Sequence, residues 1–264
     1  MGFKRCSFIV LLMLVSCKKK SYPDVSVVGH GCMGLEILNS VYHDNTEEAF
    51  DLATGMAGLD GVEIDVQLSL DGSIWLFHDD EISLETNGSG CLGTKSDQEI
   101  KTLSYKSLYK ENLVKLSELD LTRIKEKKLF IDLRHYNKCE GAFYDPVEWI
   151  AAINSIEFPA DIELYIVLSI PEWSQDFIDQ GYKVLLSAFE EEELSDLLSQ
   201  GFMADGFMVK NAIINETDVQ AIRALGKKVF IFEMRAPKSI RKALQKGPDG
   251  VVSDDLRAAL IERN

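Results

Sequence analysis

Short apolar runs alternate with amphipathic stretches along most of the chain. The runs are rich in Val, Ile, Leu and Phe, which is typical of parallel strands buried on both faces. We predict eight strands of this kind: Val25–Gly29, Gly61–Val66, Lys128–Leu133, Glu163–Ser169, Lys183–Ser187, Asp205–Val209, Lys228–Phe232 and Gly250–Ser253.

Helical patterns lie between these strands. Cap-forming residues followed by acids open two of them, in Asn45-Thr46-Glu47-Glu48 and Asn215-Glu216-Thr217-Asp218. The predicted helices are Thr46–Thr54, Val147–Ser155, Glu190–Ser199, Glu216–Leu225 and Lys238–Gln245. Alternating strands and helices predict parallel pairing, so residues 25–264 are expected to form one (β/α)8 TIM barrel. An open doubly wound sheet is the alternative, disfavoured because no Gly-rich phosphate loop follows the first strand.

A ninth apolar run, Ile74–His78, follows the second strand after a short turn. A parallel crossover needs a dozen or more residues, so this run must return as a hairpin. The dipeptide Asp71-Gly72 is a strong two-residue hairpin signal. The fold class therefore includes a β-hairpin extension after the second strand.

The hairpin register decides which polar residues meet. If Asp71-Gly72 is the loop, Asp65 lies opposite His78 and Glu63 lies opposite Asp80. We therefore expect the hairpin to bring the acids and the histidine together.

The N-terminus has the layout of a signal for export. Lys4 and Arg5 precede a short apolar run that ends in Leu14-Val15-Ser16-Cys17, which resembles a bacterial lipobox. We predict a signal peptide at 1–16, a lipidated Cys17, and a tether at 17–24. This makes the chain an exported bacterial lipoprotein, anchored to a membrane on the periplasmic or cell-surface side. An ordinary signal peptide cut nearby is the alternative.

Charge and cysteine content narrow the chemistry. The formal net charge of −15 argues against a nucleic-acid partner, and an anionic substrate requires a metal or a local cation. Apart from Cys6 and Cys17, the cysteines are Cys32, Cys91 and Cys139. We expect free or buried thiols; one disulfide, of undetermined pairing, is the alternative.

Polar residues at strand ends are the candidate chemistry. Glu63 and Asp65 share one face of a buried strand, and Asp132 ends another, a pattern that suits Mg²⁺ or Ca²⁺. His30 and His78 are predicted at the barrel rim, where two imidazoles can act as general base and general acid. His43 and His135 are weaker candidates for substrate contact.

An ordered set of motifs carries a resemblance. The motifs are Gly29-His30-Gly31, Asp44-Asn45-Thr46-Glu47-Glu48-Ala49-Phe50, Gly61-Val62-Glu63-Ile64-Asp65-Val66-Gln67, Asp71-Gly72, Phe77-His78-Asp79, Thr86-Asn87-Gly88-Ser89-Gly90 and Asp249-Gly250-Val251-Val252-Ser253-Asp254. Together they resemble the glycerophosphodiester phosphodiesterase family, densely from 25 to 90 and more thinly to 256.

The resemblance implies a metal-dependent TIM-barrel hydrolase of small phosphodiesters. By position, His30 and His78 match the acid/base pair, and Glu63 and Asp65 match metal ligands. Asp132 stands where the family usually has a Glu ligand. A hydroxyl next to the phosphate, deprotonated by one histidine, would attack phosphorus, and the other histidine would protonate the leaving alkoxide.

The chain departs from the family pattern at its phosphate-binding positions. Gly31 stands where an Arg usually follows the first histidine, and Arg134 stands in place of Lys. Arg134 or Lys210 could supply the missing cation, and Phe232 replaces a frequent Trp. A non-catalytic ligand-binding lipoprotein and a phospholipase acting on lysophospholipid or phosphoinositide therefore remain alternatives.

Overall fold

The computed structural model describes residues 20–35, 40–137, 139, 142–143 and 145–264. The predicted signal peptide and Cys17 lie outside the described residues. Within the predicted tether, Tyr22 is buried and its amide donates to the Arg263 carbonyl at 2.7 Å, so the packed chain already includes Tyr22. Among the described helices, none combines the length and the apolar character needed to cross a bilayer.

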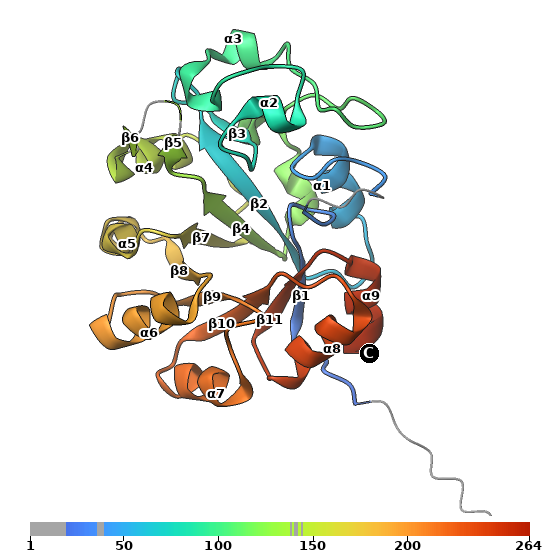
Figure 1. Cartoon of the computed structure of the whole chain (residues 1–264), viewed down its shortest axis with the longest axis vertical. Coiled ribbons are helices and arrows are strands. Elements are labelled where there is room, and N and C mark those ends of the chain that lie inside the picture. Colours follow the sequence, from blue (N-terminus) through green and yellow to red (C-terminus); the bar gives the residue numbers. More distant parts are fainter. Residues whose placement is uncertain (1–19, 36–39, 138, 140–141, 144) are drawn as a thin grey trace, which may run out of the picture.

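Eight parallel strands close into a barrel within the described part of the chain (Figure 1). Strand β1 pairs with β2 on one side and with β11 on the other, which closes the sheet and excludes the open alternative. The (β/α)8 barrel is thereby confirmed. Its strands are β1 Ser26–Gly29, β2 Gly61–Leu68, β4 Lys128–Leu133, β7 Glu163–Leu168, β8 Lys183–Ala188, β9 Gly206–Lys210, β10 Lys228–Phe232 and β11 Gly250–Ser253.

Helices surround the barrel, and the five predicted ones are present within one residue at each end. Thr46 caps the first of them by accepting from the Ala49 amide, and Asn215 forms a capping box with Asp218. The α-helices are α1 Glu47–Thr54, α2 Ile82–Glu85, α3 Asp97–Ile100, α4 Pro146–Asn154, α5 Ser174–Asp179, α6 Glu191–Gln200, α7 Glu216–Ala224, α8 Pro237–Gln245 and α9 Leu256–Arg263. Short 3₁₀ turns are η1 Leu92–Thr94, η2 Leu116–Glu118, η3 Leu121–Ile124 and η4 Pro171–Trp173.

Two layers of apolar side chains hold the barrel. The larger layer lies between strands and helices. The smaller fills the barrel interior and includes Phe130, stacked on Tyr165 at 4.9 Å and edge-on to Phe230 at 4.8 Å. These aromatic rings occupy the barrel interior, so polar chemistry is confined to its rim.

The connection from β2 to β4 forms an excursion beyond the end of β2, seen at the top of Figure 1. It contains β3 (Ile74–Leu76) and has its own apolar cluster, which includes Trp75, Phe77 and Tyr105. The Asp97 carboxylate accepts from the Trp75 indole and pairs with Lys115, which ties the cluster together.

Strand β3 pairs antiparallel with β2, but the predicted register is wrong by one residue. Val66 faces Leu76, and the Phe77 amide donates to the Asp65 carbonyl. The turn is longer than two residues because the Ser69 amide donates to the Ser73 carbonyl, and the Ser73 amide to the Ser69 hydroxyl. Asp65 is therefore opposite Phe77 and not opposite His78.

A disulfide joins Cys91 in the excursion to Cys139, with Cα atoms 5.8 Å apart. Cys139 lies between the two short strands β5 (Tyr136–Asn137) and β6 (Ala142–Phe143). The expectation of free thiols is wrong for this pair and right for Cys32, which is buried and free. Sequence spacing could not choose the pair, because a separation of 48 residues is bridged only in the folded chain.

Candidate active site

Most of the polar residues singled out in the sequence gather around one cavity at the C-terminal ends of the barrel strands. This end of such barrels is where loops and strand ends combine into active sites. The cavity lining includes side chains in or shortly after five of the strands, β1, β2, β4, β10 and β11, and His78 from the excursion: His30, Asp65, His78, Asp132, Arg134, Phe232, Arg235 and Asp254.

Three carboxylates form the most polar part of the site. One oxygen from each of Glu63, Asp65 and Asp132 lies within 4.8 Å of the other two. Glu63 and Asp65 share a face of β2, and Asp132 is the register partner of Asp65 on β4. Glu63 and Asp65 are each 2% exposed, so water cannot screen their repulsion.

The closeness of the three carboxylates changes their pKa values. Burial and the charge of Asp65 raise the pKa of Glu63, and burial together with Asp65 raises that of Asp132 to about 6. Asp65 is held ionised despite its burial, since His78, Arg134 and His30 lower its pKa.

Three convergent oxygens fit a hard divalent cation such as Mg²⁺ or Ca²⁺, which prefers carboxylate ligands. This donor set therefore fits the metal that the sequence predicts.

His30 is held at the cavity by a carboxylate from the last barrel strand. Its Nδ1 lies 2.7 Å from Asp254 Oδ1, and Asp254 is 2% exposed. Burial disfavours the imidazolium, but the hydrogen bond to Asp254 and the charge of Glu63 outweigh it and raise the His30 pKa to about 9. Nδ1 donates to Asp254, which leaves Nε2 for proton transfer; it lies 4.0 Å from Glu63.

His78 reaches the same cavity by a route that the strand pattern does not reveal. It lies beyond β3, where the amide of Gln67 donates to the Asp79 carbonyl at 2.7 Å and fixes the departing chain. His78 Nδ1 lies 2.8 Å from Asp79 Oδ1. Burial again opposes its charge, but Asp65 and the bond to Asp79 raise its pKa to about 9. The two histidines thus share one arrangement, each with a carboxylate on Nδ1.

The predicted cations separate in the structure. Arg134 lines the cavity, with Nη1 3.9 Å from Asp65 and 4.0 Å from Asp132. Lys210 does not line it; its Nζ lies 3.2 Å from Glu233, which does. Arg235, which the sequence reasoning missed, lines the cavity instead, and its Nε lies 3.3 Å from Asp254.

The backbone conformation and close contacts at Gly31 disfavour any larger residue at this position. Its φ is +50°, and a Cβ there would lie 2.9 Å from the Cβ of Asp44. The Gly31 amide donates to Glu63 at 2.8 Å. An Arg at position 31 would require the loop to move, since such a φ and contact disfavour any L side chain.

Other predicted residues lie nearby with different roles. Phe232 lines the cavity with its ring 6.2 Å from His30. His135 borders an adjoining pocket, where Nδ1 lies 3.2 Å from Ser169. Asp254 could have been found in the sequence, because it ends an apolar strand in the same way as Asp132.

Comparison with known proteins places the chain. The model of the "Glycerophosphoryl diester phosphodiesterase family" matches residues 30–164, just over half of the 264 residues. The chain belongs to this family. It is therefore a phosphoric diester hydrolase by family, with the family's motifs at the rim of a TIM barrel.

Individual relatives agree with this placement. The protein YhdW of Bacillus subtilis (strain 168), provisionally named a glycerophosphodiester phosphodiesterase, is 27% identical over 222 residues, 80% of this chain and 88% of YhdW. A provisionally named glycerophosphoryl diester phosphodiesterase from Agrobacterium tumefaciens superposes with TM-score 0.75 at 18% identity, covering 90% of this chain and 97% of that one. An Oleispira antarctica phosphodiesterase, solved with the product sn-glycerol-3-phosphate, gives TM-score 0.72 at 24% identity, covering 90% and 96%. The two structural matches show the shared fold.

Proposed function

We propose that the protein hydrolyses glycerophosphodiesters to glycerol 3-phosphate and an alcohol, using His30 and His78 as its acid/base pair. One observation carries this proposal. Both histidines face a single cavity, each with Nδ1 bound to a carboxylate, beside three convergent carboxylates. The product bound to the Oleispira antarctica relative supports glycerol 3-phosphate as the product here.

The proposed reaction needs two proton transfers at the imidazole Nε2 atoms. One histidine takes the proton from a glycerol hydroxyl as that oxygen bonds to phosphorus, and the other gives a proton to the departing alkoxide oxygen. This first step releases the alcohol and leaves a cyclic phosphate of glycerol. Water then opens the cyclic phosphate, with the acid and base roles of the two histidines exchanged. Asp254 and Asp79 keep each ring in the tautomer that presents Nε2.

A divalent cation is proposed at Glu63, Asp65 and Asp132, where it would neutralise charge on the phosphoryl oxygens. These residues contribute an all-oxygen ligand set, and their mutual repulsion is relieved by a cation. The amide of Asn45 donates to Asp65 Oδ2 at 2.9 Å and leaves the other Asp65 oxygen turned toward Arg134. The set is therefore pre-oriented by neighbouring groups.

Two guanidinium groups are proposed to hold the phosphate in place of the absent Arg at position 31. Arg134 and Arg235 line the cavity, and both present planar, charged donors suited to phosphate oxygens. Arg235 is also fixed by donating to the Leu35 carbonyl at 3.0 Å. The negative field of the chain is thus offset locally.

The test is a substrate panel with and without metal. The purified protein is incubated with glycerophosphodiesters of several alcohols and with a lysophospholipid, in Mg²⁺, in Ca²⁺ and in EDTA. We expect turnover that EDTA abolishes and that His30→Ala or His78→Ala reduces by about 10²-fold or more. Asp249→Asn, at the opposite end of the barrel strands, is the matched control and should retain activity. Binding of the diesters without turnover would refute the proposal and favour a ligand-binding lipoprotein.

Export and lipid anchoring at Cys17 are part of the proposal and rest on the N-terminal sequence alone. The diester would then be cleaved outside the cytoplasm, at the membrane face where the protein is held.

A further inference from the structure

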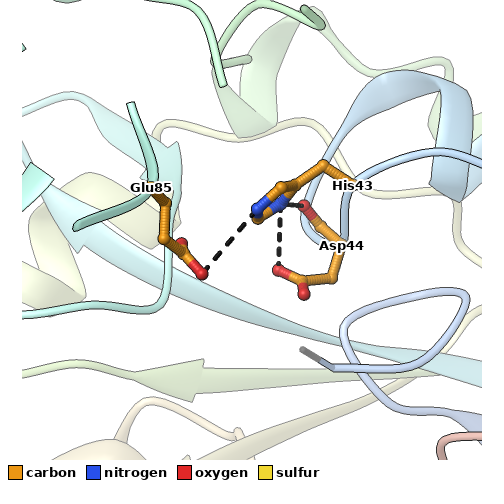
Figure 2. A group of neighbouring side chains, drawn as sticks. All are labelled: His43, Asp44 and Glu85. Carbon is orange, nitrogen blue, oxygen red and sulfur yellow. Dashed lines mark hydrogen bonds and ion pairs between the residues drawn. The ribbon is translucent and has the colours of Figure 1, made fainter. Parts of the chain in front are cut away.

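A second group of metal-ligating side chains lies outside the catalytic cavity. His43 and Asp44 belong to the loop before α1, and Glu85 is the last residue of α2 in the excursion. One donor atom from each lies within 4.8 Å of the other two. Figure 2 shows both carboxylates turned toward the imidazole ring of His43.

The distances within this group leave the second imidazole nitrogen available. His43 Nδ1 lies 3.0 Å from the Asp44 carbonyl oxygen and 3.4 Å from Asp44 Oδ1, and since a carbonyl only accepts, Nδ1 carries the proton. Nε2 faces Glu85, whose Oε1 is 3.7 Å away, longer than a hydrogen bond, and in the neutral imidazole it carries the lone pair that a cation would bind. Adjacent ligands of a tetrahedral ion with bonds of about 2.1 Å lie roughly 3.4 Å apart, close to this separation.

Two buried oxygen atoms without hydrogen-bond partners belong to this group or to the ring stacked on it. They are Glu85 Oε2 and the hydroxyl of Tyr105 among the described side chains. Tyr105 is 2% exposed, its ring stacks on His43 at 3.9 Å, and the charges of Asp44 and Glu85 act most strongly on it. Unsatisfied buried oxygens are costly, and a cation bound by Glu85 would relieve this cost at its carboxylate.

The surrounding structure holds the imidazole in position. The His43 amide donates to Glu111, the Thr46 hydroxyl donates to the His43 carbonyl, and Tyr105 packs against the ring face. Such supporting contacts orient the ligands of metal sites. Asp44 is 4% exposed, so its charge has little access to solvent.

We propose that His43, Asp44 and Glu85 bind a divalent transition-metal cation, with Zn²⁺ as the best match. One imidazole with two carboxylates suits Zn²⁺, whereas the all-oxygen group of the catalytic cavity suits Mg²⁺ or Ca²⁺. The ion would join the loop before α1 to the excursion. This site does not depend on the proposed catalytic function.

Zn²⁺ titration of the purified protein in excess Mg²⁺ tests the site, since Mg²⁺ competes for the all-oxygen group. Calorimetry should show one equivalent of Zn²⁺ bound. His43→Gln and Glu85→Gln, changes on separate elements, should each weaken its affinity by about tenfold or more. Glu63→Gln and His135→Gln are matched controls in which this equivalent persists. Melting temperature should rise with Zn²⁺ in the controls and not in the two site variants.

X-ray absorption of the Zn²⁺-loaded protein gives an independent readout. One imidazole nitrogen among oxygen ligands is expected, and it should disappear in His43→Gln. Zn²⁺ affinity unchanged in both site variants, or lost in Glu63→Gln, would overturn the proposal.

Discussion

Asp254→Asn separates the orientation of His30 from its presence. The substitution keeps the size of the side chain but removes the charge that faces His30 Nδ1 at 2.7 Å. The new amide can donate to Nδ1, which would place the ring proton on Nε2 and remove the base. Asp254 is thus a positioning residue whose effect acts through His30.

The size of the effect follows from the geometry. A hydrogen bond to a charged partner contributes about 1.5–3 kcal/mol, which corresponds to roughly 10- to 100-fold in rate. If the tautomer with the proton on Nδ1 is also lost, the fall in rate should approach the full contribution of acid/base catalysis, about 10² to 10⁴-fold. We expect kcat to fall within this wider range. KM should change less than kcat, because Arg235 loses its ion pair with Asp254 but keeps its bond to the Leu35 carbonyl.

Steady-state kinetics across pH provide the assay. Asp254 raises the pKa of His30, so Asp254→Asn lowers that pKa and should move the pH–rate profile toward lower pH. Asp249→Asn is the matched control. Asp249 lies just before β11, at the end of this strand opposite Asp254, and its carboxylate accepts from the Val229 amide. A kcat within about threefold of the parent, with an unmoved pH profile, would refute the assigned role of His30.

Four further predictions concern other parts of the chain. Arg235→Ala should raise KM and the inhibition constant for inorganic phosphate by about tenfold, with a smaller change in kcat, and Arg235→Lys should restore part of the lost affinity. Equal KM values in Arg235→Ala and the parent would show that Arg235 does not bind the phosphate. Four hydrogen-bond donors lower the pKa of Asp97, so its carboxylate should stabilise the fold above its unfolded pKa of about 3.9 and lose this effect as the pH falls. In denaturant unfolding, Asp97→Asn should therefore be less stable than the parent by about 2 kcal/mol at pH 7, and the two should converge in acid. Reduction of Cys91–Cys139, or Cys91→Ser, should lower the free energy of unfolding by up to about 4 kcal/mol, and an unchanged urea midpoint would contradict this. Cys17→Ser should release the protein from membranes and abolish its acyl mass, whereas Cys32→Ser should not.

The sequence by itself determined the barrel and most of its site. The strands are predicted because apolar runs of strand length need burial on both faces, and this requirement is local. Acids or histidines that end such runs, as Asp132 and His30 do, mark the rim, since parallel strands all end on the same side. The pairing of Glu63 with Asp65 follows from the alternation of side chains along one strand.

Only the tertiary structure decided how distant parts complete the site. Asp254 meets His30 across 224 residues because closure of the barrel pairs the first strand with the last. Arg235 enters the cavity from the loop after β10, where no sequence pattern marks it.

The hairpin that carries His78 shows the same limit at short range. Its turn signal was correct, but hydrogen bonds between Ser69 and Ser73 lengthen the turn and shift the register by one residue. His78 reaches the cavity because Gln67 holds the chain where it leaves the strand. Local propensity identifies which residues are placed in strands and turns, whereas the contacts that fix their final positions form only when the chain packs.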